Sequence, residues 1–216
     1  MSAALGDGQR FVPIVAEEFA QIAAFCPIFL AKDSETGAFY FGAMLGFHEG
    51  QNLFIDEPNA ARFRPLHARR LPFYTAGEDL AIDLGNARVN TVEGEPLFTD
   101  AGEPTEYLNN VMEMFRRLRR GEEQTKLFIQ TMLELDLVEP VDIDIKFDDG
   151  EHIEIDGLYG IKRTAVGELS DDQALMLFRR GYLYLAHVTI MSLTQLPALI
   201  QRRNRQQVNA SAPYLL

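Results

Sequence analysis

The sequence predicts a single α+β domain, with mostly antiparallel strands and hairpins packed against several helices and a long C-terminal helix. Three observations predict this class. Apolar and polar residues alternate over 141–147 and again over 152–156, which is the period of half-buried strands. Apolar residues recur at helical spacing over 104–135, where one face of the pattern is apolar. The segment 181–200 carries no formal charge and lies between two arginine pairs, as a long apolar helix would.

The length and composition indicate one globular domain that covers residues 1–216. A chain of 216 residues is long enough for one buried core, or one core with a small lobe, but short for two ordinary domains. Its 47% apolar and 24% charged residues are typical of folded proteins.

The N-terminal third predicts a helix followed by a short antiparallel meander. Four apolar residues recur at helical spacing and Pro27 ends the helix. Apolar runs at 28–30, 39–46 and 53–55 then predict three strands. The helical residues are Val15, Phe19, Ile22 and Cys26.

The middle of the chain predicts a loop and two helices. Proline, arginine and aromatic residues over 56–78 indicate mostly loop, with short strands at 80–84 and around 97–98. Pro104 and Thr105 open a helix that Gly121 is expected to interrupt. A second helix then continues to about residue 135, and Pro140 closes the region.

The last third predicts a hairpin, a short strand and two helices. The hairpin covers 140–156, the strand 158–163, and Ser170 caps the helix that follows. The terminal helix comes next, and we expect residues 206–216 to form a loosely ordered tail.

The net charge of −12 argues against nucleic acid or a membrane surface as the main partner. Such a field repels phosphate backbones and anionic lipid, so we expect neither nucleic acid nor membrane, and basic partners or cations are favoured. Most of the basic residues are arginines, and ten of the sixteen arginines occur in pairs, among them Arg69-Arg70. Their guanidinium groups suit carboxylates and phosphates, although ordinary solvated positions on helix flanks are the simpler interpretation.

The cellular location expected from the sequence is the cytoplasm. Cys26 is the one cysteine, which excludes an internal disulfide, and we expect it to be a small buried hydrophobe. The N-terminus shows no basic and apolar secretory signal. Segment 181–200 is long enough to span a membrane, but its many polar residues and Pro197 favour a buried core helix.

The hairpin places carboxylates opposite each other. A three-residue loop with a left-handed Gly150 keeps the apolar residues of both strands on one face. That register sets Asp144 opposite Glu154 and Asp142 opposite Asp156. Opposed carboxylates repel by up to ~1 kcal/mol per pair, so we expect a compensating cation on this face. A basic partner, an internal arginine and a bound Ca²⁺ or Mg²⁺ remain open, and a solvated or arginine-covered face is the simplest interpretation.

The spacing of the histidines does not indicate a metal enzyme. None of the four has the spacing of a zinc or iron site, and no metal is expected. His187 follows the pattern of a hydrogen-bonded core histidine. The chain lacks a phosphate-binding loop, a nucleophile elbow and a dinucleotide fingerprint, so no cofactor is expected.

Several short motifs in order resemble the SapC-like family over about residues 11–199. The motifs are Glu17-Glu18-Phe19 before Pro27-Ile28-Phe29, Gln51-Asn52-Leu53-Phe54, Arg69-Arg70-Leu71-Pro72-Phe73, Gly157-Leu158-Tyr159-Gly160-Ile161 and the helix 181–187. The family takes its name from a surface-layer protein transport locus, and its members tend to be encoded beside halogenase-like flavoproteins, cupin-like proteins and outer-membrane receptors. The resemblance therefore implies an accessory role in surface-layer, envelope or nutrient-uptake systems, with no catalytic residues to carry over.

Three hypotheses follow from the sequence. The first is a binding protein that contacts a protein or peptide partner through the acidic hairpin, the arginine pairs and nearby aromatic residues. The second is an enzyme that uses His187 with Tyr159, Tyr184 or a hairpin carboxylate. The third is a homo-oligomer that buries the terminal helix between subunits. The candidate binding residues are Asp142, Asp144, Glu154, Asp156, Arg69, Arg70, Tyr159, Tyr184 and His187.

Overall fold

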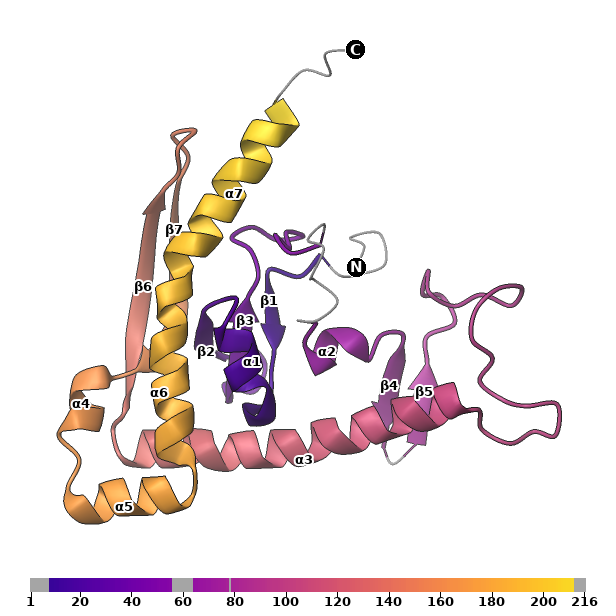
Figure 1. Ribbon diagram of the computed structural model, residues 1–216, viewed down its shortest axis with the longest axis horizontal. Helices are drawn as coiled ribbons and strands as arrows, with labels where there is room; N and C mark the ends of the chain where they lie inside the picture. Colours follow the sequence, from indigo (N-terminus) through magenta and orange to yellow (C-terminus); the bar gives the residue numbers. More distant parts are fainter. Residues whose placement is uncertain (1–7, 56–63, 78, 212–216) are drawn as a thin grey trace.

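The structure is a computed structural model that describes residues 8–55, 64–77 and 79–211. A five-stranded antiparallel sheet packs against helices in one α+β domain, as the sequence predicts. A second, two-stranded sheet lies at the far end of the longest helix (Figure 1). The strand order of the large sheet is β1 (Phe11–Pro13), β3 (Phe39–Met44), β2 (Ile28–Lys32), β7 (His152–Ile161) and β6 (Val138–Lys146).

The expected meander of 28–30, 39–46 and 53–55 is right for two strands and wrong for the third. β2 and β3 pair antiparallel, but the third neighbour is β1, and residues 53–55 form a turn. The Leu53 N–H donates to the Leu45 carbonyl at 2.8 Å, and the Phe54 N–H donates to the Asn52 side chain at 3.0 Å. Both apolar side chains are buried, so an apolar run that resembles a strand fills the core as a turn.

The predicted N-terminal helix is confirmed as η2 (Ala16–Glu18) followed by α1 (Phe19–Ala23). Phe19 lies in the core, with its ring 4.8 Å from that of Phe41. Cys26 is buried, as expected, and burial raises the pKa of its thiol well above the usual value. Cys26 is therefore an inert core residue.

The helix expected to break at Gly121 is continuous. α3 (Glu106–Glu134) runs for 29 residues and begins at Thr105, whose hydroxyl accepts from the Leu108 N–H. A Cβ at position 121 would lie 2.7 Å from Cγ2 of Val15, so the glycine allows η2 to approach the helix closely. The prediction was wrong because a packing glycine and a helix-ending glycine look alike in the sequence.

The described part of the segment expected to be loop contains regular structure. α2 (Leu66–Arg69) and β4 (Phe73–Ala76) follow the undescribed residues 56–63, and β4 pairs with β5 (Asp79–Ile82). Phe73 packs with Leu108 and Val111 of α3, which makes a small cluster separate from the main core. The strand expected around 97–98 is reduced to one bridge between Phe98 and Pro104.

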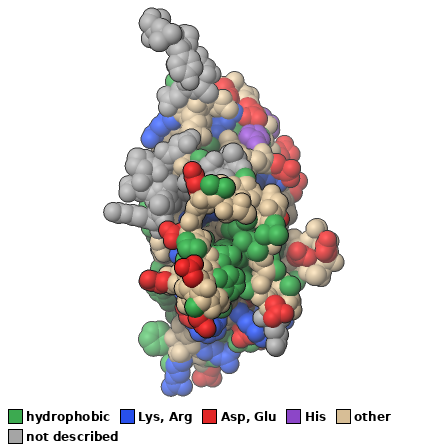
Figure 2. Space-filling model, turned by 90° about the vertical axis from the view of Figure 1, so that its right-hand side faces the viewer, with side chains coloured by type: hydrophobic (Ala, Val, Ile, Leu, Met, Phe, Trp, Pro, Cys, Tyr) green, Lys and Arg blue, Asp and Glu red, His purple; other side chains and the backbone are tan. Residues whose placement is uncertain are grey.

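The end of the molecule that contains β4 and β5 faces the viewer in Figure 2. Hydrophobic side chains gather near the centre of that face, with acidic side chains around them and basic side chains toward the lower end (Figure 2). Leu84, Val92 and Phe98, all from the connection between β5 and α3, are exposed.

The predicted hairpin and the separate strand 158–163 form one longer hairpin. β7 is continuous from His152 to Ile161 and carries a register shift opposite β6 between Val141 and Ile143. Pro140 does not close the region but lies within β6. β6 is the last strand of the sheet, where a residue without an N–H is tolerated.

The C-terminal helix is long, as predicted, but it is not a buried core helix. α6 (Tyr182–Ser192) continues through η4 (Leu193–Gln195) into α7 (Leu196–Ser211), which rises beside the β6–β7 hairpin (Figure 1). One face holds α6 in place, since the buried Ser192 hydroxyl accepts from the Ile28 N–H at 2.9 Å. Tyr184 and Met191 are exposed on the other side.

The residues expected to form a loosely ordered tail are helical in part. Helix α7 extends to Ser211, so the tail expected from residue 206 is helical up to that point, and residues 212–216 lie outside the described part. Among the described residues, the helical stretch Tyr182–Val208 is long and apolar enough to cross a membrane, a test that core helices of soluble proteins also pass.

Two short helices complete the fold. α4 (Arg163–Gly167) follows β7 directly. α5 (Asp171–Arg179) begins at Ser170, whose hydroxyl accepts from the Gln173 N–H as predicted for a cap. α4, α5 and α6 therefore surround the lower end of the hairpin (Figure 1).

Candidate functional site

The β6–β7 hairpin brings the predicted carboxylates to one exposed face. The three-residue loop is confirmed, since the Phe147 N–H donates to the Glu151 carbonyl and Gly150 has a φ of 90°. Asp144 lies opposite Glu154 as predicted, and both side chains are exposed.

The second predicted carboxylate pair is wrong. Val141 pairs with Leu158 while Ile143 pairs with Ile155, so β7 has an extra residue at the position of Asp142. Gly157 takes a φ of 77° there, which marks a bulge in β7. Asp142 and Asp156 therefore share the exposed face without being directly opposed.

The group that compensates the surviving pair belongs to the same hairpin and is a cation when it is protonated. His152 Nε2 lies 2.6 Å from Oδ1 of Asp144, and this hydrogen bond raises the pKa of His152, with a smaller contribution from Glu154. A ligand atom from each of Asp144, His152 and Glu154 lies within 4.8 Å of the others. Among the described residues this trio could offer metal ligands, although all three side chains are exposed and Asp144 already engages His152.

The hairpin tip is held by an arginine that sequence analysis did not single out. The Arg203 side chain is 3% exposed, and it donates to Asp149 at 2.5 Å and to Glu151. Its guanidinium also lies 4.1 Å from the centre of the Phe147 ring. The pKa of Asp149 is lowered by the Glu151 N–H and by Arg203. The arginine thus covers the tip of the hairpin and leaves its strand face free.

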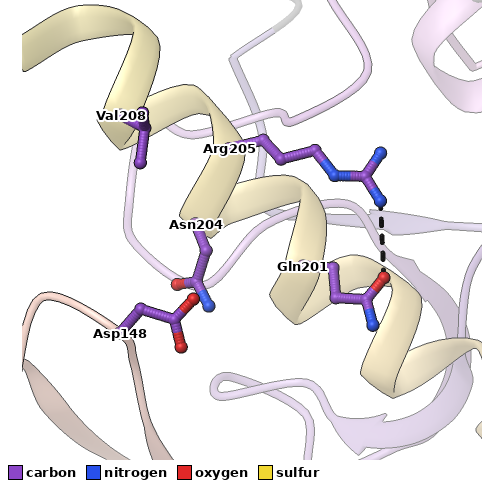
Figure 3. Close-up of a pocket in the computed structure, with 5 residues that line it drawn as sticks. All are labelled: Asp148, Gln201, Asn204, Arg205 and Val208. Atoms are coloured by element: carbon purple, nitrogen blue, oxygen red, sulfur yellow. Dashed lines mark hydrogen bonds between the residues drawn. The ribbon is translucent and has the colours of Figure 1, made fainter. Parts of the chain in front are cut away.

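A pocket lies between this tip and α7. It has a volume of about 380 Å³ and is lined by Asp148 and by four residues of α7, with Asp148 and Asn204 pointing toward each other (Figure 3). Arg205 donates to Gln201 at 3.4 Å along the helix. Polar and apolar surface contribute about equally to the pocket, and it opens widely to solvent, as the exposed Gln201, Arg205 and Val208 indicate.

The predicted pair Arg69-Arg70 lies elsewhere, at the end of α2. The Arg70 guanidinium is 5.1 Å from the Tyr74 ring, and Arg69 is exposed. His67 Nε2 lies 3.4 Å from Glu122 Oε1 on α3. Burial and the nearby Arg70 lower the pKa of His67 to about 4, so the contact joins a neutral imidazole to a carboxylate at neutral pH. Burial raises the pKa of Glu122.

Glu18 connects this region to the start of α1. Its two carboxylate oxygens accept from the Leu66 N–H at 2.8 Å and from the Val15 N–H at 3.1 Å. Burial raises the pKa of Glu18, while these two backbone donors act in the opposite direction. A carboxylate that satisfies two backbone donors of different elements is a structural link.

Tyr159, Tyr184 and His187 do not converge on one site. The Tyr159 ring packs edge-on against Phe39 and lies 5.1 Å from Lys32 Nζ. Tyr184 is exposed, with 61% of the residue accessible. His187 is exposed as well, so the expectation of a core histidine is wrong, and its Nδ1 donates to the Leu183 carbonyl at 2.7 Å.

His187 lies at a cavity between α4, α5 and α6. Apolar side chains dominate the lining, and among the described residues no carboxylate lines it. An acid–base pair around His187 is therefore not assembled here, and the residues grouped with it as an enzyme site are dispersed.

Sequence reasoning missed the residues that act across long sequence separations. Arg203 pairs with Asp149 over 54 positions and Glu18 with Leu66 over 48. The arginine pair 202–203 was visible, but nothing local indicates which acidic residues it meets. Glu18 was visible only as part of a motif.

Comparison with known proteins assigns the chain to a family. The family model described as SapC matches residues 1–199. The chain belongs to the SapC family. No curated protein and no solved structure matches it.

The SapC match includes the whole hairpin and ends within α7. Asp144, Glu154 and the bulge at Gly157 all lie inside the matched part, whereas Arg203 follows it. The contact that holds the hairpin tip thus comes from a segment after the SapC-matched region.

Proposed function

We propose that this SapC-family protein is a cytoplasmic accessory protein that binds a basic, extended segment of a partner protein along the free edge of β6. In this proposal it serves a surface-layer, envelope or nutrient-uptake system. The observation that carries the proposal is an edge strand whose exposed face is acidic. Among the described strands, none lies on the outer side of β6.

The hydrogen-bond pattern of the hairpin leaves backbone groups of β6 free. The Phe147 N–H points to β7, and such bonds alternate along antiparallel strands, so Ile145 and Ile143 also face β7. The backbone groups of Asp144 and Lys146 therefore point away from β7, toward the open edge. An added strand binds through groups of this kind.

The charge of the edge selects the partner. Asp142, Asp144, Glu154 and Asp156 are exposed on the same face, and the chain has a net charge of −12. A second copy of this chain meets the edge with like charge, whereas lysines or arginines at alternate positions of a partner strand meet carboxylates. Acidic edge strands thus oppose self-association and favour a basic strand.

The rival enzyme hypothesis lacks a comparable observation. His187, Tyr159 and Tyr184 lie apart, and the carboxylates with raised pKa values, Glu18 and Glu122, do not line the cavity at His187.

We also propose that α6 and α7 pack on the domain instead of spanning a membrane. Ser192 and Arg203 support this, since each is a buried side chain that makes a polar contact within the protein.

The test uses a fluorescent peptide of alternating lysine and valine. Fluorescence anisotropy should show binding that weakens with salt, because exposed charges contribute. Asp142→Asn/Asp144→Asn should weaken it at least fivefold. Glu93→Gln/Glu95→Gln removes the same charge from an exposed loop and should leave the affinity within twofold.

A second peptide distinguishes binding by strand addition from binding by charge attraction alone. Methylation of alternate backbone nitrogens keeps the lysines but removes donors on one edge, so its affinity should fall at least tenfold. Equal binding of both peptides, or an equal loss in the two double variants, would overturn docking at β6. Light scattering on the same samples reports whether the protein is a monomer or an oligomer.

A further inference from the structure

The cavity between α4, α5 and α6 has the properties of a small-molecule site. Its volume is about 380 Å³, within the usual range for ligand pockets. Its walls come from all three helices, with Val166 on α4, Ala174 on α5, and Leu183 and Ile190 on α6. Apolar walls around a space of this size favour an apolar ligand over water.

The local sequence explains why the space is open. Gly167 ends α4 at the cavity wall, and a Cβ built there meets no atom within 4 Å. Ala174 on the facing helix is also small. Protein interiors are normally filled by side chains, so two small residues that leave apolar walls uncovered mark a place where another group can pack.

Two polar groups border these apolar walls. Arg163 is exposed, and among the described residues none forms an ion pair with it. His187 uses its Nδ1–H on the Leu183 carbonyl, which leaves Nε2 available to a ligand. The guanidinium fork of arginine matches a carboxylate, and such charge-assisted pairs are the stronger hydrogen bonds.

We propose that this cavity binds a small molecule with an unbranched apolar body and one carboxylate, held by the apolar walls and by Arg163 and His187. At ~30 Å³ for each water-sized group, the cavity has room for about a dozen non-hydrogen atoms. Decanoate has about this size. The site is independent of the β6 edge, and the function proposed for that edge does not depend on it.

The experiment titrates decanoate into the ¹⁵N-labelled full chain and follows backbone amides by NMR. Saturable shifts should concentrate in α4, α5 and α6. Decanamide, which has the same size without the charge, should bind at least tenfold more weakly, because it cannot form the charge-assisted pair with Arg163.

Variants separate the two parts of the proposed site. Arg163→Gln should weaken decanoate at least tenfold and change decanamide by less than twofold. Arg119→Gln, an exposed arginine on α3, is the control for the loss of charge and should change neither. Ala174→Leu narrows the cavity and should reduce binding of both ligands at least tenfold.

A second cavity-filling variant keeps the test decisive if Ala174→Leu does not fold. Gly167→Leu has room at its Cβ, and thermal unfolding verifies that it is folded. Decanoate that causes no saturable shift up to 1 mM, a concentration chosen as about the weak limit for a specific ligand, would overturn the proposal. Equal binding to the wild type, Arg163→Gln and Gly167→Leu would overturn it too. Neither result bears on peptide binding at β6, which uses other residues.

Discussion

Arg203 of α7 donates a 2.5 Å hydrogen bond to Asp149 at the tip of the β6–β7 hairpin. β7 pairs with β2 at only Leu30–Tyr159 and Ala31–Leu158, so the outer part of the hairpin extends beyond the sheet. Arg203 therefore fixes the end of the hairpin that the sheet does not hold. Through it, the C-terminal helix orients the free edge of β6.

Replacing Arg203 with alanine should loosen the hairpin tip. The guanidinium is almost fully buried while Asp149 and Glu151 remain partly exposed, so we expect a loss of roughly 2 kcal/mol, below the range for fully buried pairs. Hydrogen exchange should accelerate at 145–153 more than in α3. Arg203→Lys keeps the charge without the fork and should give an intermediate effect.

The control for this change is Arg205→Ala on the same helix. Arg205 is exposed and contacts Gln201, so its loss should change stability by less than ~0.5 kcal/mol. Unchanged exchange at the tip in Arg203→Ala would show that other contacts, such as Phe47 against Phe147 and His48 against Glu151, hold the hairpin without the arginine.

The neutral His67 should make the protein less stable in mild acid. Its pKa is about 4 in the folded protein, because of burial and Arg70, and about 6.5 when unfolded. Above pH 6.5 both states are neutral, and this residue has no effect. Between pH 6.5 and 4 only the unfolded state gains the proton, so the free energy of unfolding falls as pH falls. Below pH 4 no further loss occurs.

Urea unfolding of the wild type and His67→Gln measures this contribution. At ~1.4 kcal/mol per pH unit, the wild type should lose roughly 2 kcal/mol more than the variant between pH 7 and pH 5. Glu122, which contacts His67, and Glu18, which accepts from the neighbouring Leu66 N–H, have raised pKa values, which lower stability as pH rises, and both are present in both proteins. Equal pH dependence of the two proteins would contradict the burial argument.

The sequence predicts the hairpin well because the information there is local. Alternation gives the faces, and the loop length gives the register from Ile143 to Phe147. The bulge could not be predicted in the same way. Gly157 was visible as part of a motif, but a glycine that ends a strand and one that allows a bulge have the same local pattern.

The candidate site is less predictable because side chains meet there across the fold. The acidic face was predicted from residues within the hairpin, while its internal cation, His152, was visible but not assigned. The cavity at His187 depends on three helices, so no spacing along the chain reports it. His187 itself looks like a core residue because its helix is apolar almost all around.

Asp144 should control the protonation of His152. Its hydrogen bond and charge raise the pKa of the histidine, so His152 should titrate above the usual 6.5 in the wild type. In Asp144→Asn the pKa should fall toward that value. NMR titration of the imidazole protons measures both. Because the pKa of His152 is raised in the folded protein, the stabilisation from its protonated form is present below pH 6.5 and is lost as pH rises through the folded pKa and the imidazole loses its proton.

Glu154→Gln is the comparison for this titration. Glu154 is the smaller influence on His152, so its replacement should lower the pKa less than Asp144→Asn does. The reverse order would place the imidazole beside Glu154 in solution.

Gly121 should be required for close packing, although alanine is the better helix former. In an exposed helix, Gly→Ala stabilises by ~1 kcal/mol. Here the new Cβ would lie 2.7 Å from Cγ2 of Val15, and Val15 is buried where η2 meets α3. Overpacking of this kind typically costs 1–3 kcal/mol, so we expect Gly121→Ala to destabilise the protein by roughly 1 kcal/mol net.

Relief of the contact provides the decisive comparison. Val15→Ala removes both Cγ atoms and costs packing by itself, but it leaves the Val15 Cβ 2.8 Å from the new methyl group, so Gly121→Ala should cost less in that background without becoming stabilising. The double-mutant cycle in urea unfolding isolates the interaction between the two sites. Additive effects would mean that α3 shifts to admit the methyl group, and Gly121 would then be replaceable.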